Sequence, residues 1–265
     1  MDFAPVSSPA PFLVAENLSK RFGGLAAVTQ FSISVGSGEI VGLIGPNGAG
    51  KTTVFNLLTG AYQPDSGSIH VAGSRTRGLK PHRVTALGLA RTFQNIRLFR
   101  DMTVLENAMT GYQTQCKSSV LQAVLKHRRS RAEEARIRAH AYELLDLMGL
   151  AGKADMLSGN LPYGEQRKLE IARALAAAPK VLLLDEPAAG MNDTESEGLQ
   201  KLLLDIRKRF NVSLLVIEHD MAFVMGMVQR LLVLDHGTII AHGTPAEIRK
   251  HPKVIEAYLG KDCTG

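Results

Sequence analysis

The residues of this chain whose types and spacing best suit chemistry lie in one glycine-rich run. It reads Gly45, Pro46, Asn47, Gly48, Ala49, Gly50, Lys51, Thr52 and Thr53, and it follows the apolar residues 40–44. The run fits the pattern G-x-x-x-x-G-K-[ST]. Its glycines let backbone N–H groups converge on phosphate oxygens, and a helix that starts near Lys51 directs its positive dipole end at the same anion. We therefore expect a nucleoside triphosphate site; the alternative is a turn that only looks similar.

Two side chains of this run are expected to act on the triphosphate directly. Lys51 should reach the β and γ phosphates, and the hydroxyl of Thr52 should help to hold Mg²⁺. A second pair of chemical groups follows the apolar residues 181–184. There Asp185 is expected to hold Mg²⁺ through water, and Glu186 is placed to polarise an attacking water as general base. The alternative is that both acids are only solvated at a strand end.

Short apolar runs of strand length should position these groups. Continuous apolar residues are typical of strands buried on both faces of a parallel sheet. Four such runs occur, at residues 40–44, 181–184, 214–217 and 231–234. Residues 31–35 and 68–71 alternate polar and apolar side chains, which predicts an antiparallel sheet of half-exposed strands beside the nucleotide. The core is therefore expected to be α/β.

The middle of the chain is expected to be helical. The strand signal disappears between residues 97 and 161, and residues 131–148 contain few strand formers. Capping boxes at Thr103–Glu106 and Thr244–Glu247 predict two helix starts, the second of them opening a short closing helix. The basic run at 126–129 is either a solvated face or a mark of an anionic partner.

Composition limits the class of protein. The chain has 265 residues, enough for one large domain or one domain with a sizeable insertion. Its formal net charge of +6 suits phosphate ligands, anionic lipid surfaces or nucleic acid about equally. Cys116 and Cys263 form no metal or disulfide framework and are expected to be thiols of a reducing compartment. The N-terminus lacks a secretory signal pattern and residues 214–234 carry charges, so membrane association is expected through a partner protein.

The segment before the two acids makes a family resemblance specific. Residues 161–175 read LPYGEQRKLEIARAL and resemble the signature of ATP-binding-cassette (ABC) ATPases, usually L-S-G-G-Q. The resemblance implies an α/β fold with a P-loop NTPase (RecA-like) core, an antiparallel β subdomain and a helical insertion, with ATP and Mg²⁺ as ligands. It also implies that the signature faces the γ-phosphate of ATP held by a second nucleotide-binding subunit. The signature residues are Leu161, Pro162, Tyr163, Gly164, Glu165 and Gln166.

Other positions line up with the family in order. Gln94 matches a glutamine that touches Mg²⁺ and water and connects to the transmembrane partner. His219 matches a histidine that contacts the γ-phosphate, and Phe22 occupies the aromatic position that stacks on adenine. Taken alone, each of the three has a plainer alternative, as a surface glutamine, a packed histidine or a core phenylalanine.

Three residues depart from the family pattern. Pro162 stands where the signature serine is usual, Tyr163 where its first glycine is, and Asn192 where an aspartate is common. Proline is tolerated near a helix start, but the serine hydroxyl is lost. A hydrogen bond to a charged group contributes about 1.5 to 3 kcal/mol, so closure on ATP is expected to be weaker unless the Gly164 N–H, the helix dipole and water compensate.

Several segments look like one group within the family, the ATPase subunits of bacterial branched-chain amino acid importers. They are residues 21–25, 91–94, 97–99, 163–173, 186–192 and 257–260. This resemblance implies a second ATP-binding subunit, either a distinct paralogue or another copy, and two transmembrane permeases fed by a periplasmic solute-binding protein. The place implied is the cytoplasmic face of the inner membrane, with no nucleic acid partner. Sister groups that serve urea, short amides or lipopolysaccharide export remain alternatives, as does a non-transport ABC ATPase.

The resemblance also implies a division of the chain. We expect a flexible tail at residues 1–11 and a single ABC ATP-binding domain at 12–265. Within that domain the expected parts are a core at 12–96 and 167–240, a helical subdomain at 97–166 and a C-terminal segment at 241–265. Hydrolysis of ATP coupled to transmembrane transport is the activity implied. A small-molecule phosphotransferase would need no signature helix, so residues 161–175 argue against it.

Overall fold

The computed structural model describes residues 11–114 and 128–259. Most of the tail expected at 1–11, both cysteines and the start of the basic run at 126–129 lie outside these ranges. The chain forms two compact units. The first unit comprises Met1–Arg91 with Lys180–Gly265, and the second unit comprises Thr92–Pro179.

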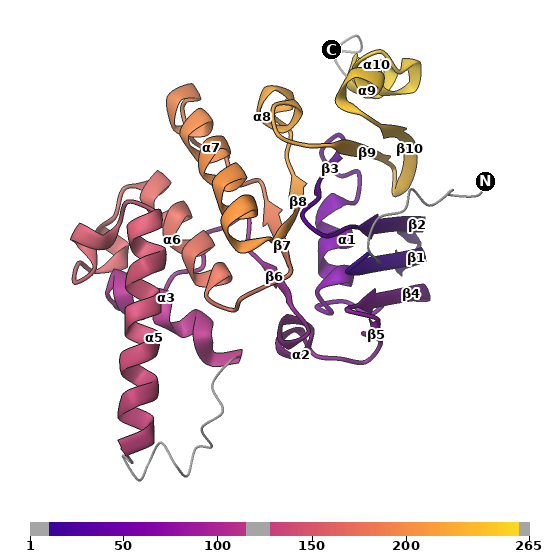
Figure 1. The fold of residues 1–265 in the computed structure, drawn as a ribbon. Coiled ribbons are helices and arrows are strands. Elements are labelled where there is room, and N and C mark those ends of the chain that lie inside the picture. Colours follow the sequence, from indigo (N-terminus) through magenta and orange to yellow (C-terminus); the bar gives the residue numbers. More distant parts are fainter. Residues whose placement is uncertain (1–10, 115–127, 260–265) are drawn as a thin grey trace. The chain divides into compact units, whose positions relative to one another are not determined.

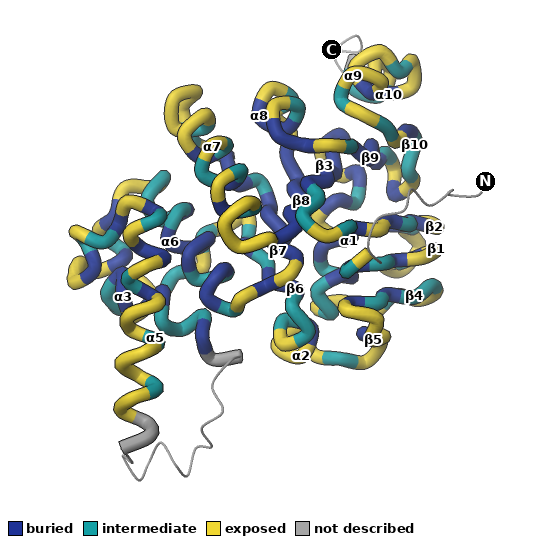
Figure 2. Tube along the Cα trace, viewed as in Figure 1, coloured by how far each residue is buried: buried dark blue, intermediate teal, exposed yellow. Residues whose placement is uncertain are grey.

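A six-stranded sheet forms the centre of the first unit, in the order β10-β9-β3-β8-β7-β6 (Figure 1). Its strands are β3 (Ile40–Ile44), β6 (Leu89–Arg91), β7 (Val181–Asp185), β8 (Ser213–Ile217), β9 (Arg230–Asp235) and β10 (Thr238–Gly243). Neighbouring strands are parallel, except that β10 runs antiparallel to β9. Every residue of β3, β7 and β8 is buried (Figure 2). The four strands predicted from continuous apolar runs are confirmed.

An antiparallel sheet forms the other part of this unit. Its order is β2-β1-β4-β5, with β1 (Leu13–Phe22), β2 (Leu25–Val35), β4 (Ser66–Val71) and β5 (Ser74–Arg75). Buried side chains of β1, β2 and β4 share one hydrophobic core with α1 (Lys51–Leu58) and the six-stranded sheet; Phe31 and Phe55 are its largest members. The predicted antiparallel sheet and the helix start at Lys51 are confirmed.

The remaining helices of the first unit are α2 (Pro81–Ala86), α7 (Asp193–Phe210), α8 (Met221–Met225), α9 (Pro245–Arg249) and α10 (Pro252–Leu259). The capping box of Thr244 and Glu247 opens α9, as predicted. The expectation of a single closing helix is wrong, because the chain forms two short helices there. The second begins at Pro252, which has no backbone N–H and suits a first helical position.

The described part of the second unit is helical. Its α-helices are α3 (Val104–Thr110), α5 (Arg128–Leu147) and α6 (Tyr163–Leu175), with 3₁₀ turns at Gly111–Thr114, Ala151–Lys153 and Ser158–Asn160. The predicted capping box of Thr103 and Glu106 opens α3. The helical subdomain expected at 97–166 falls inside this unit, and its boundaries stay a prediction. Within residues 11–114 and 128–259, no helix combines the length and apolarity needed to cross a membrane.

Candidate functional site

The candidate site lies at the carboxyl ends of three neighbouring strands. β3, β8 and β7 are parallel and adjacent, so their carboxyl ends meet at one edge of the sheet, which is where ligands of open α/β sheets bind. The glycine-rich run, called the phosphate loop below, follows β3, and Asp185 and Glu186 stand at the end of β7. His219 comes just after β8. The first unit therefore brings together the phosphate loop, both acids and the histidine.

The phosphate loop has a backbone that only glycine can adopt at two of its positions. Gly45 has a φ of 151°, and a Cβ there would stand 2.0 Å from the carbonyl oxygen of Leu234. Gly50 has a φ of 104°, and its Cβ would stand 2.4 Å from the carbonyl oxygen of Ala27. The backbone of the loop therefore passes close to β9 at Gly45 and close to β2 at Gly50, with no room for a side chain. Gly45 and Gly50 are thus the residues that allow the phosphate loop to adopt this conformation.

The side chain of Lys51 lies inside this loop. It is buried, and its ammonium donates hydrogen bonds to the carbonyl oxygens of Gly45 at 2.5 Å and Pro46 at 2.9 Å. A positive charge in a loop of glycines at the start of a helix fits a phosphate anion. The hydroxyl of Thr52 and the carboxylate of Asp185 are oxygen ligands of the kind that Mg²⁺ takes. The residues present therefore fit Mg²⁺ with a nucleotide, and the ligand roles of single residues stay predictions.

Arg91, at the end of β6, is a member of the site that sequence reasoning missed. Its Nη2 lies 2.6 Å from Oδ2 of Asp185, and its Nη1 donates to Oδ1 of Asn56 at 2.6 Å. The guanidinium also lies over the ring of Phe55, 5.4 Å from the centroid. The ion pair is buried, so Arg91 offsets the charge of the acid predicted to hold Mg²⁺. Its only sequence signal was its place three residues before Gln94.

Glu186 and His219 approach each other at the ends of β7 and β8. Oε2 of Glu186 lies 4.0 Å from Nδ1 of His219. Glu186 has a left-handed backbone, with φ 47°, and its N–H donates to the carbonyl oxygen of Ile217 at 2.9 Å. Such a conformation is uncommon for a residue other than glycine and persists where surrounding contacts fix it. The geometry suits a carboxylate held in place for proton transfer.

Glu218 is the second residue that sequence reasoning missed. Its carboxylate is buried and accepts hydrogen bonds from the backbone N–H of Ala188 at 2.8 Å and of His219 at 3.1 Å. Oε2 of Glu218 also lies 3.6 Å from Nδ1 of His219. Burial raises the pKa of Glu218, while the N–H groups of Ala188 and His219 act in the opposite direction. An acid next to a predicted catalytic histidine was the signal available in the sequence.

Phe22 lies on the surface of the first unit at the end of β1. Its side chain is 44% exposed, and its ring meets that of Tyr62 edge to face, with centroids 5.3 Å apart. The ammonium of Lys20 lies 5.7 Å from the centroid of the Phe22 ring. Phe22 is therefore a surface residue and not a core phenylalanine, as stacking on a planar ligand would require. The role in adenine binding stays a prediction.

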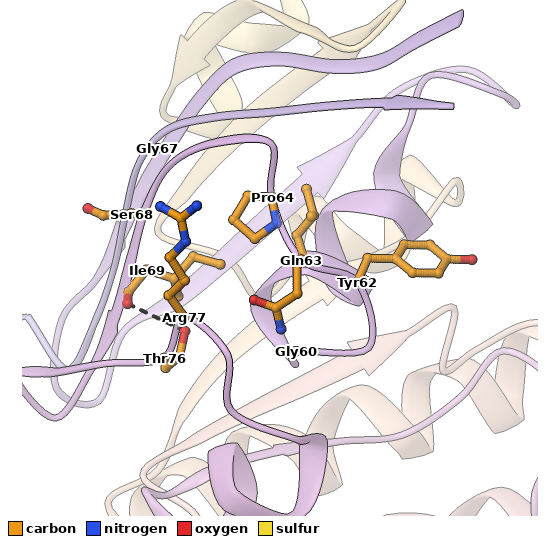
Figure 3. A pocket seen from close by; sticks show the side chains of 10 residues that line it. Gly60, Tyr62, Gln63, Pro64, Gly67, Ser68, Ile69, Thr76 and Arg77 are labelled. Carbon is orange, nitrogen blue, oxygen red and sulfur yellow. Dashed lines mark hydrogen bonds between the residues drawn. The ribbon is translucent and has the colours of Figure 1, made fainter. Parts of the chain in front are cut away.

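Tyr62 also borders a small hollow beside the loop that precedes β4 (Figure 3). The hollow lies among Gln63, Pro64, Ile69 and Arg77, and the ring of Tyr62 points away from it (Figure 3). It has room for about one water molecule. None of its lining residues belongs to the phosphate loop, so this hollow is not the nucleotide site.

In the second unit, the signature residues surround the start of α6. Pro162 occupies the N-cap position and gives no side-chain cap, while its carbonyl oxygen accepts from the N–H groups of Glu165 and Gln166, each at 3.0 Å. The hydroxyl of Tyr163 accepts a hydrogen bond from Arg167 at 3.2 Å. The departure at Tyr163 thus adds a contact to the helix. Gln94 is exposed and also belongs to this unit.

The departure at Asn192 has a local explanation. Asn192 is the N-cap of α7, and its side chain accepts from the N–H of Glu195 at 2.9 Å while Glu195 accepts from the N–H of Asn192 at 3.1 Å. Asparagine is among the best N-cap residues. The residue therefore starts α7 where an aspartate would do the same.

A buried charge cluster joins α6 to the segment that contains Gln94. Arg167 donates to the carbonyl oxygens of Phe93 and Gln94, and it lies 3.2 Å from Oε2 of Glu170. Oε1 of Glu170 accepts from the N–H of Phe93 at 3.3 Å, and Arg173 lies 3.9 Å from it. Burial raises the pKa of Glu170 and lowers that of Arg173. This cluster holds the backbone of the Gln94 segment on the signature helix.

Replacing Arg167 by methionine is expected to lower the free energy of unfolding by about 3 to 5 kcal/mol, because Glu170 would remain as a buried charge without its main partner. Urea denaturation followed by circular dichroism measures this change. The half-buried ion pair of Lys153 and Glu165 on the surface of the second unit, with N···O at 2.6 Å, provides the control. Lys153→Met should cost less than about 1 kcal/mol. Equal losses for the two variants would contradict the assigned importance of the cluster.

Comparison with known proteins gives two family matches. Residues 28–189 match the family described as ABC transporter, and residues 238–264 match the family described as branched-chain amino acid ATP-binding cassette transporter. The chain is 45% identical to the high-affinity branched-chain amino acid transport ATP-binding protein LivG of Salmonella typhimurium, across 95% of this chain and 98% of LivG. It is 44% identical to BraF of Pseudomonas aeruginosa, a protein with the same description, across the same shares.

Two more distant similarities complete the comparison. The lipopolysaccharide export system ATP-binding protein LptB of Haemophilus influenzae is 36% identical, across 94% of this chain and 97% of LptB. A solved ATP-binding cassette of an ABC transporter in its ADP conformation superposes with a TM-score of 0.82 at 30% identity, across 95% of this chain and 100% of that one.

Proposed function

This chain belongs to the ABC transporter family, and from that premise we propose that it hydrolyses ATP to power a branched-chain amino acid importer. The observation that carries the choice of solute is the 45% identity to LivG over nearly the whole length of both chains. The match of residues 238–264 to the branched-chain amino acid family supports the same choice from a segment outside the general ABC match. Nothing in an ATP-binding cassette touches the solute, so the argument for the cargo rests on similarity alone.

The geometry supports a division of roles among the residues of the first unit. Lys51 and the N–H groups of the phosphate loop bind the phosphates, and Phe22 stacks on adenine. Thr52 and, through water, Asp185 would hold Mg²⁺, which supplies charge neutralisation on the phosphates. Glu186 takes the proton of the attacking water, and His219 donates a hydrogen bond to the γ-phosphate. In the second unit, Gln94 would complete the metal and water contacts.

The partners of the chain follow from the same proposal. The signature residues 161–166 serve the ATP of a second ATP-binding subunit, a paralogue or another copy, and that subunit's signature serves the ATP held here. Two permeases hold the pair at the cytoplasmic face of the inner membrane, and a periplasmic binding protein delivers the solute to them. Support comes from the descriptions of LivG and BraF as ATP-binding proteins of transport systems.

Uptake measurements test the choice of cargo. Deletion of the gene for this chain in its own host should abolish ATP-dependent uptake of labelled leucine, isoleucine and valine. Wild-type protein should restore uptake, and Glu186→Gln should not. Undiminished uptake of all three amino acids after deletion would overturn the proposed cargo. The similarity to LptB makes lipopolysaccharide export the second candidate, and accumulation of lipopolysaccharide in the inner membrane after deletion would favour it.

Pro162→Ser is expected to raise ATP-dependent association of the two cassettes or the ATPase rate. A serine at the N-cap of α6 would supply the hydroxyl that this chain lacks, and a hydrogen bond of about 1.5 to 3 kcal/mol to a charged group corresponds to about 10- to 100-fold in affinity. Gel filtration with ATP and a phosphate-release assay measure the two quantities. Pro81→Ser, at the start of α2, is the control and should change neither. If Pro162→Ser leaves both the association of the cassettes and the ATPase rate unchanged, the missing serine hydroxyl does not limit closure of the two cassettes on ATP.

A further inference from the structure

Glu218 is a buried acid that the division of roles above does not use. Its side chain is 1% exposed, and it directly follows β8, whose five residues are all buried. Taking a carboxylate out of water is costly unless it is paired and hydrogen-bonded. Two backbone N–H groups and one imidazole nitrogen face it. The backbone of Asp220 also hydrogen-bonds to it, and the carboxylate is thus surrounded by groups at the ends of β7 and β8.

The contacts of Glu218 join the ends of two strands. The N–H of Ala188 belongs to the turn that follows Glu186, whereas His219 lies two residues after the end of β8. The carbonyl oxygen of Ile217 accepts the N–H of Glu186. Ile217 at the end of β8 therefore binds the N–H of Glu186, and Glu218 just after β8 binds the N–H of Ala188, so that both hydrogen bonds hold this turn. These two hydrogen bonds stabilise the left-handed backbone of Glu186.

The same carboxylate faces the imidazole of His219. Oε2 of Glu218 lies 3.6 Å from Nδ1, and Oε2 of Glu186 lies 4.0 Å from the same atom. Both acids therefore face the Nδ1 edge of the ring, which favours the neutral tautomer with its hydrogen on Nδ1 and leaves Nε2 for other contacts. The partner of one ring nitrogen commonly decides how the other is used.

We propose that Glu218 is a positioning residue for ATP hydrolysis, which fixes the turn after Glu186 and the imidazole of His219 relative to each other. This proposal rests on the ATPase function proposed above. The residue touches neither nucleotide nor water in the proposed mechanism; it acts through Glu186 and His219. A small displacement of either group lowers the rate without weakening nucleotide binding.

Glu218→Gln tests the proposal in the full-length chain. The amide oxygen of glutamine can still accept one N–H group, but the side chain loses its charge and its second acceptor. We expect kcat for ATP hydrolysis to fall about 10- to 100-fold, while the dissociation constant for a fluorescent ATP analogue stays unchanged. Nitrogen NMR should show that a smaller share of the neutral His219 rings carries its hydrogen on Nδ1. The His219 signals are identified by their absence from the spectrum of the His219→Gln variant.

Glu39→Gln is the matched control. Glu39 precedes β3 at the opposite edge of the sheet and makes the same kinds of contact, accepting the N–H of Gly36 at 2.8 Å and pairing with Arg230 at 2.5 Å. The Glu39→Gln variant should have a lower melting temperature than the wild type and the same kcat. A wild-type kcat in Glu218→Gln would overturn the proposal. So would Glu218→Gln with unchanged His219 signals and with a melting temperature lowered as much as in Glu39→Gln, because its effect would then be one on stability alone. A wild-type chain without ATPase activity would instead overturn the proposed function, while the His219 signals would still report on Glu218.

Discussion

Replacing Glu186 by glutamine is expected to lower kcat for ATP hydrolysis by about 10²- to 10⁴-fold, because general base catalysis contributes about that much. Glutamine has nearly the same shape and can keep the left-handed backbone and the N–H bond to Ile217. ATP binding should therefore persist, and the variant should accumulate as a nucleotide-bound pair of cassettes. Phosphate release measures the rate, and gel filtration with ATP measures the trapped pair.

Glu247→Gln is the control for this experiment. Glu247 sits in the capping box of α9, where it accepts the N–H of Thr244 at 2.7 Å, and glutamine also serves at that position of a capping box. Its rate should match the wild type. Normal turnover by Glu186→Gln would refute the assignment of the general base.

The second large effect is expected from Gly45→Ala. A Cβ at this position would stand 2.0 Å from the carbonyl oxygen of Leu234, and a φ of 151° is strained for any residue with a Cβ. The strain costs about 1 to 3 kcal/mol, and the clash requires the loop to leave β9. We expect the variant to lose more than about 3 kcal/mol of unfolding free energy and to bind ATP at least about 100-fold more weakly.

Gly48→Ala separates backbone strain from the clash. Gly48 lies in the same loop with a φ of 79°, but a Cβ there meets nothing within 4 Å. This variant should lose only the strain contribution, about 1 to 3 kcal/mol. Urea denaturation and fluorescent ATP titration measure both variants. Equal losses would show that the contact with Leu234 does not fix the loop.

The fold was largely readable from local patterns. Continuous apolar runs marked β3, β7, β8 and β9, because strands inside a parallel sheet are buried on both faces. Strand β6 was not predicted, since its three residues are too few to show a period. The edge strand β10 was not predicted either, because it is only partly buried and its apolar run, Ile239 to Ala241, is shorter than those of the central strands.

The chemistry was readable only where a motif has a fixed spacing. The phosphate loop and the pair Asp185 and Glu186 are local in the sequence. Arg91 and Glu218, in contrast, derive their meaning from partners on other strands. Arg167 likewise contacts a segment far away in the sequence. Periodicity and spacing along one chain do not show which strand ends become neighbours, so these residues came only from the structure.

The strand order of the first unit has a consequence for how the protein is made. β3 pairs with β8 on one edge and with β9 on the other, and both partners are encoded near the end of the chain. During synthesis β3 leaves the ribosome long before either partner exists, so its two edges stay open to wrong pairing. Leu234, whose carbonyl oxygen lies next to Gly45, is itself part of β9. We therefore expect a nascent chain that ends before β9 to bind ATP more weakly than the full chain.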